Sequence, residues 1–126
     1  MRTTYDKLVR DRVTARLDEN GVAYGTRRAE PNELGQLLMC KLREEIEELG
    51  STAVASEVAE EIVDIVEVAY AIAEAHGVTE EDIAQRRSEK RRERGAFADG
   101  VVLLWTEAPD TTSLAASEAP PRATTK

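Results

Sequence analysis

The stretch from residue 41 to residue 70 constrains the fold most strongly, because it carries two acidic helical patterns separated by a short break. At roughly 100° per residue, Leu42, Ile46 and Leu49 fall in one narrow apolar stripe. The break is Gly50-Ser51-Thr52. The apolar stripe of the second pattern is formed by Val58, Ile62, Ile65, Val66 and Ala69. The stretch therefore predicts two amphipathic helices joined by a tight turn.

Carboxylates border the apolar stripe of both predicted helices. They belong to Glu44, Glu45 and Glu48 in the first helix and to Glu61 and Asp64 in the second. Packing the two helices together would make these groups converge, and close carboxylates repel one another unless cations lie between them. Hard divalent cations that accept oxygen ligands, Mg²⁺ or Mn²⁺, suit such a cluster. The alternative is two solvated acidic faces on ordinary amphipathic helices.

The order of these acids resembles a known group of enzymes. EExxE at 44–48, followed by ExxD at 61–64, is similar to the all-α nucleotide pyrophosphohydrolase superfamily. That superfamily includes MazG-like enzymes, dimeric dUTPases and phosphoribosyl-ATP pyrophosphatase. The resemblance implies Mg²⁺-dependent hydrolysis of a nucleoside triphosphate to a nucleoside monophosphate and pyrophosphate, with Mn²⁺ as a second candidate ion. It also implies a homodimer or homotetramer.

Two further motifs extend the resemblance over about residues 5 to 105. YDKLVRDRV at 5–13 resembles the opening of the phosphoribosyl-ATP pyrophosphohydrolase-like subgroup, although Thr14 stands close to where those proteins carry proline. KxxxRGxF at 90–97 resembles the phosphate-contacting stretch of MazG-like proteins, with Ala96 where a second glycine is common.

The resemblance assigns roles to particular residues. It implies that Mg²⁺ is bound by Glu45, Glu48, Glu61 and Asp64, with Glu44 and either Glu57 or Glu60 assisting or polarising water. Arginine and lysine suit phosphate oxygens, and the phosphate-binding residues it implies are Lys90, Arg94, Lys7 and Arg10. For Lys7 and Arg10 the alternative is a solvated basic face that pairs with acids elsewhere in the chain.

Composition limits the class of protein. The chain has 126 residues, enough for one domain, and its net charge of −8 argues against binding a nucleic-acid polymer. The single cysteine, Cys40, is typical of a reducing cytoplasm. No apolar run is long enough to span a membrane, and no hydrophobic signal core follows Met1.

The rest of the chain predicts an all-α fold, an antiparallel bundle of about four helices. We expect the first acidic helix from Pro31 to Gly50, and the second from about residues 52–56 to a cap at His76. Two more helices are expected, over 5–19 and from a cap at Thr79 to about Arg94. Residues 22–28 and 101–105 predict a short two-stranded β ribbon. The domain should cover 1–105, and the small polar residues of 106–126 predict a disordered tail.

Two other functions are compatible with the same patterns. The chain could be a phosphoribosyl-ATP pyrophosphatase of histidine synthesis, although the opening motif favours an enzyme that removes non-canonical nucleotides. Alternatively, it could be a helical interaction or regulatory module whose acids are merely solvated. The interaction module predicts no dependence on metal, and this separates it from both enzymes.

Overall fold

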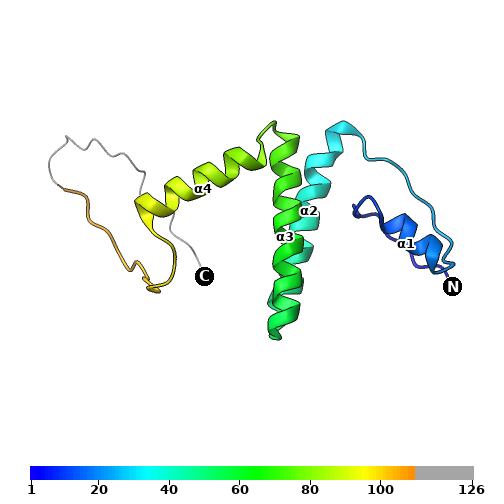
Figure 1. The fold of residues 1–126 in the computed structure, drawn as a ribbon, viewed down its shortest axis with the longest axis horizontal. Helices are drawn as coiled ribbons and strands as arrows, with labels where there is room; N and C mark the ends of the chain where they lie inside the picture. The colour runs from blue at the N-terminus through cyan, green and yellow to red at the C-terminus, as the bar shows by residue number, and fades with distance from the viewer. Residues whose placement is uncertain (110–126) are drawn as a thin grey trace. The chain divides into compact units, whose positions relative to one another are not determined.

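The computed structural model describes residues 1–109, which contain four α-helices and no strand. They are α1 (Val13–Glu19), α2 (Pro31–Gly50), α3 (Ala55–Ala75) and α4 (Glu80–Arg94) (Figure 1). The prediction of an all-helical fold with about four helices is confirmed. The described chain falls into two units, Met1–Arg94 and a second unit that begins at Gly95. None of the described helices is both long and apolar enough to cross a membrane.

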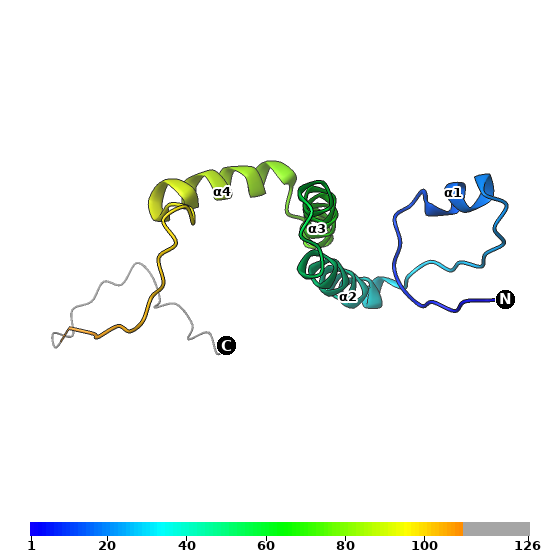
Figure 2. The same ribbon diagram turned by 90° about the horizontal axis from the view of Figure 1, so that it is seen from below.

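The centre of the first unit is the pair α2 and α3. The two helices lie side by side and antiparallel in both views (Figures 1 and 2). Among the described helices, α3 also contacts α4, whereas α1 packs against no other helix. The α2–α3 pair is therefore the scaffold on which any site in this unit must be built.

Local signals in the sequence account for the ends of α2. Pro31 occupies the first turn, where its missing N–H costs no hydrogen bond. The side chain of Glu33 accepts a hydrogen bond of 2.9 Å from the backbone N–H of Glu30, as in a capping box. Arg27 pairs with the same Glu33 carboxylate. The helix ends at Gly50 as the sequence predicts.

The ends of α3 and α4 also follow the sequence pattern. His76 is the C-cap residue of α3, and its Nδ1 lies 2.9 Å from the carbonyl oxygen of Ile72. The hydroxyl of Thr79 accepts a hydrogen bond of 3.0 Å from the backbone N–H of Asp82 at the start of α4. Both capping predictions are confirmed.

The contact face of α2 and α3 differs from the predicted apolar stripe. Ile46 is 52% exposed and Ile62 is 43% exposed. The residues turned inward instead follow alternating three- and four-residue steps, the spacing of a two-helix seam. The seam consists of Leu38, Leu42, Glu45 and Leu49 on α2 and of Val58, Glu61, Ile65, Val68 and Ile72 on α3. A single neighbouring helix covers only a narrow face, so residues at the edge of the stripe stay in solvent.

Two predictions of local structure are wrong. Residues 5–12 are not helical, and α1 has only seven residues. An isolated helix of this length is marginal in water, and side chains of the preceding segment pair with α2 and α3. The β ribbon is absent from the described residues, because neither 22–28 nor 101–105 forms a strand. Two short strands need support from other elements, yet Val22, Tyr24 and Val101 are all exposed.

The structure describes only part of the predicted tail, residues 106–126. Residues 106–109 are described and lie in the second unit, outside any helix. The remainder of the predicted tail, 110–126, lies outside the described residues.

Candidate metal centre

Two acidic residues occupy positions of the α2–α3 seam that would otherwise hold apolar side chains. Glu45 stands between Leu42 and Leu49 on α2, and Glu61 stands between Val58 and Ile65 on α3. Glu45 is one of three buried residues in the described chain, the others being Leu38 and Val68. A polar side chain at a seam position lowers the stability of a helix pair. These two glutamates therefore invite a functional explanation.

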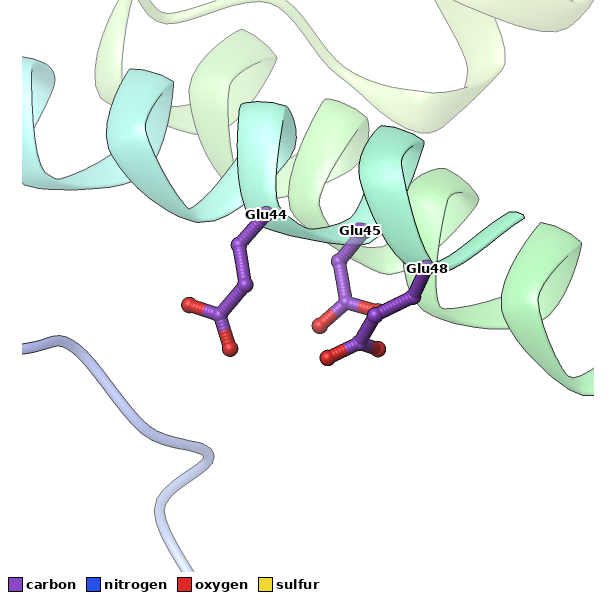
Figure 3. Close-up of side chains that lie close together, drawn as sticks. All are labelled: Glu44, Glu45 and Glu48. Carbon is purple, nitrogen blue, oxygen red and sulfur yellow. The ribbon is translucent and has the colours of Figure 1, made fainter. Parts of the chain in front are cut away.

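Three more carboxylates surround the two seam glutamates. One oxygen each from Glu44, Glu45 and Glu48 lies within 4.8 Å of the others, and Figure 3 shows these side chains pointing to the same side of α2. A second set, within the same distance, joins Glu45 to Glu61 and Asp64 of α3. Glu45 belongs to both sets, and we call the five residues the carboxylate cluster.

Two oxygens of the carboxylate cluster are buried without a hydrogen-bond partner. They are Oε2 of Glu45 and Oε2 of Glu61, one from each helix. The Glu45 side chain is only 6% exposed, so water cannot readily solvate its second oxygen. A buried acceptor left unpaired costs about 1–3 kcal/mol, and more when it is charged. When both carboxylates are ionised, the two oxygens have no positively charged or hydrogen-donating partner among the described residues.

Three cations of the chain itself face the carboxylate cluster. Lys41 Nζ lies 3.3 Å from Oε1 of Glu45 and 3.5 Å from Oε1 of Glu44. Lys7 Nζ lies 3.0 Å from the same Oε1 of Glu44, and Arg10 Nη2 lies 2.7 Å from Oδ1 of Asp64. With three cations against five carboxylates, the cluster keeps an excess of negative charge when all of its groups are ionised.

The charge distribution shifts the pKa of two cluster residues in opposite directions. The hydrogen bond from Lys7, helped by the charge of Lys41, lowers the pKa of Glu44. Desolvation raises the pKa of Glu61 to about 7, together with the hydrogen bonds that its protonated form makes with Glu45 and Glu48 and the negative charge of these two carboxylates. The raised pKa means that ionisation of the Glu61 carboxyl is unfavourable beside Glu45 and Glu48, even with three cations near the cluster.

The donor set fits a hard divalent cation. All five groups offer carboxylate oxygens, which Mg²⁺ and Mn²⁺ prefer over nitrogen or sulfur. The unpaired oxygens of Glu45 and Glu61 come from different helices, and these two residues form one set of close carboxylate oxygens with Asp64. An ion bound there would supply the partner that both lack.

The other predicted phosphate-binding residues lie on a different helix. Lys90 and Arg94 belong to the last two turns of α4, which contacts α3 but not α2, the helix that carries Glu44, Glu45 and Glu48. Lys7 and Arg10 instead lie against the cluster, through Glu44 and Asp64. Lys7 and Lys41 thus pair with carboxylates of α2, and Arg10 pairs with Asp64 of α3.

Lys41 is a site residue that the sequence analysis missed. Its side chain is only 18% exposed and bridges Glu44 and Glu45. Its spacing of three and four residues from these acids places it on their side of α2. That spacing was visible in the sequence.

Comparisons of the chain with family models, curated protein sequences and solved structures find no match.

Proposed function

We propose that the chain is a Mg²⁺-dependent nucleoside triphosphate pyrophosphohydrolase that removes non-canonical nucleotides. The observation that carries the proposal is the pair of buried, unpaired oxygens of Glu45 and Glu61 within a cluster of five carboxylates. An acidic seam of this kind is unfavourable for a helix pair without a cation. The resemblance of EExxE and ExxD to nucleotide pyrophosphohydrolases supplies the reaction class.

In this proposal Glu45, Glu48, Glu61 and Asp64 hold the ion. Bound Mg²⁺ would neutralise charge on the phosphates and make a water molecule a better nucleophile. Glu44 would orient that water and accept its proton. The water oxygen would attack the α-phosphorus, the bond from that phosphorus to the bridging oxygen would break, and pyrophosphate would leave.

Basic residues would hold the pyrophosphate portion of the substrate. Lys7 and Arg10 are the nearest candidates, because they already lie beside Glu44 and Asp64. Lys90 and Arg94 are further candidates for phosphate binding, because they belong to the KxxxRGxF motif. Their side chains would have to reach the substrate from α4. Arginine binds two phosphate oxygens at once, which suits Arg10 and Arg94 to this role.

The proposal includes self-association, as a homodimer or homotetramer in the cytoplasm. Several apolar side chains of α2 and α3 are between 41% and 57% exposed, namely Met39, Ile46, Ile62, Val63 and Val66. Apolar surface of this kind is usually covered by a partner. A second copy would also help to enclose a nucleotide, which a single helix pair cannot surround.

Pyrophosphate release from canonical and damaged nucleoside triphosphates tests the proposal. Release should occur with Mg²⁺ or Mn²⁺, stop with a chelator, and be lost in Glu45→Gln. Glu47→Gln is the matched control, because Glu47 is exposed and outside both sets of close oxygens. Absence of release, together with absence of metal binding, would favour the interaction module. Rescue of a histidine auxotroph would favour phosphoribosyl-ATP pyrophosphatase.

A further inference from the structure

The N-terminal segment, residues 1–12, reaches both helices of the carboxylate cluster through two side chains. Lys7 pairs with Glu44 on α2, and Arg10 pairs with Asp64 on α3. The pairs join residues 37 and 54 positions apart in the chain. Between them, Leu8 is partly buried. The segment forms no helix before Val13, so side-chain contacts such as these position it on the cluster.

The two acidic residues that hold the N-terminal segment belong to the carboxylate cluster in which a metal ion would bind. Glu44 belongs to the first set of close oxygens and Asp64 to the second. A cationic side chain and a divalent cation cannot both lie against one carboxylate without repelling each other. Docking of the segment and binding of a divalent cation should therefore oppose each other.

We propose that the N-terminal segment is a displaceable strap: Lys7 and Arg10 act as counterions of the carboxylate cluster and are released when a divalent cation binds. The inference rests on the metal site of the proposed function. By linkage, docking of the strap weakens metal binding by the same factor as metal binding weakens docking, so a variant that docks less should bind metal more tightly. The docked strap would reduce the repulsion among the carboxylates of the metal-free cluster. After metal binding, the side chains of Lys7 and Arg10 would be unpaired and close to the bound ion.

The strength of the contacts suits displacement. The side chains of Lys7 and Arg10 are 44% and 52% exposed, and their acidic partners are about one-third exposed. Ion pairs this exposed contribute little to stability because water and salt screen them. Two such pairs can position a flexible segment, yet they yield readily to a divalent cation held by several carboxylates.

A separate attachment limits how far the strap would move. Oδ1 of Asp6 lies 3.3 Å from Nη2 of Arg27. Arg27 in turn pairs with Glu33 in the first turn of α2. Neither of these acids belongs to the carboxylate cluster. Release of Lys7 and Arg10 would thus leave the segment tied near the beginning of α2.

The affinity of the full chain for Mn²⁺, measured by calorimetry, provides the first test. Lys7→Gln/Arg10→Gln should bind Mn²⁺ about threefold to tenfold more tightly than the wild type, because two exposed pairs no longer compete. The matched control, Arg2→Gln/Arg12→Gln, removes the same two charges from the same segment and should bind like the wild type. Lys7→Arg/Arg10→Lys keeps both charges and should also bind Mn²⁺ like the wild type. This comparison stays informative if the neutral variant folds poorly.

Trypsin cleavage provides a readout that is independent of activity. The protease must take the side chain of Lys7 or Arg10 into its own pocket, so a docked side chain resists cleavage. Mn²⁺ should accelerate cleavage after Lys7 and Arg10 in the wild type, whereas cleavage after Arg2 should not change.

The outcomes separate the strap from the proposed function. Mn²⁺ binding that is equal in the wild type and the neutral variant, with unchanged cleavage, would overturn the strap alone. Absence of Mn²⁺ binding in both would overturn the metal site, and the strap with it. Tighter binding in the neutral variant and faster cleavage with Mn²⁺ would support the strap.

Discussion

Lys41 Nζ lies 3.3 Å from Oε1 of Glu45, while Oε2 of the same buried carboxylate has no hydrogen-bond partner. Lys41, on the same helix, thus pairs with one oxygen of Glu45, and the other oxygen has no partner among the described residues. A purely structural ion pair would be expected to satisfy both oxygens, because an unpaired buried acceptor is costly. The half-satisfied pair leaves an oxygen of Glu45 at which a cation could bind.

Replacement of Glu45 by glutamine should abolish metal binding and leave the metal-free fold intact. The amide removes one charge from a crowded cluster and adds N–H donors, so the free energy of unfolding without metal should rise by about 1 kcal/mol. Thermal unfolding and Mn²⁺ calorimetry measure the two effects, with Glu47→Gln as the control. Wild-type Mn²⁺ affinity in Glu45→Gln would contradict the ligand assignment.

The stability of the metal-free chain should fall as the pH rises from 5 to 8. The folded state raises the pKa of Glu61 to about 7 from an ordinary value of 4.5, so between these values it keeps a proton that the unfolded chain releases. The unfolded state is then favoured with increasing pH, and this contribution to stability is lost as the pH passes 7. Melting temperatures across this range should show the decline.

Two comparisons assign the pH dependence to Glu61. Glu61→Gln cannot ionise, so its melting temperature should vary less between pH 5 and 8. Saturating Mg²⁺ should also reduce the decline, because the ion stabilises the ionised cluster. The lowered pKa of Glu44 acts at more acidic pH and does not produce this trend. Identical slopes for the wild type and Glu61→Gln would refute the assignment.

Replacement of Lys41 by methionine should destabilise the metal-free chain by about 1–2 kcal/mol, because it leaves the buried Glu45 carboxylate without its cation. Denaturant unfolding gives the free energy directly. Arg43→Met is the control, since Arg43 is an exposed cation on the same helix. Saturating Mg²⁺ should recover part of the loss in Lys41→Met. An equal loss in both variants would show that Lys41 contributes only as a general surface charge.

Replacement of Ile46 by aspartate should disrupt self-association. Ile46 is 52% exposed on α2. A carboxylate buried at an interface should weaken association and raise the dissociation constant at least about tenfold. Sedimentation equilibrium measures the constant, and circular dichroism checks the helix content. Gln36→Asp, an exposed change on the same helix, should associate normally. A wild-type chain that stays monomeric at micromolar concentration would contradict the proposed oligomer.

Sequence reasoning succeeded where short-range signals decide the outcome. Pro31 and Gly50 mark the ends of α2, and Thr79 caps α4, because capping and helix termination depend on residues within one turn. The same reasoning named all five carboxylates that the structure places together, and also Glu57 and Glu60, which lie outside both sets of close oxygens. Neighbours at three- and four-residue steps share a helix face whatever the helix packs against.

It was less successful where a partner element decides the outcome. The predicted stripe placed Ile46 in the interface and Glu45 at its edge, whereas Glu45 is 4% exposed and Ile46 is half exposed. The amphipathic pattern of α2 does not state which part of a broad apolar face a single neighbouring helix will cover. The alternating spacing of Leu38, Leu42 and Glu45 held that information, but only beside the matching spacing in α3.

The sequence by itself determined the α2–α3 helix pair, its turn and the acids that border it, because these depend on interactions between residues close in the chain. Only the tertiary structure decided that Glu45 and Glu61 enter the seam with unpaired oxygens, and that Lys7 and Arg10 lie against Glu44 and Asp64. Such contacts join residues tens of positions apart. Their existence depends on how the chain folds back, which no local pattern specifies.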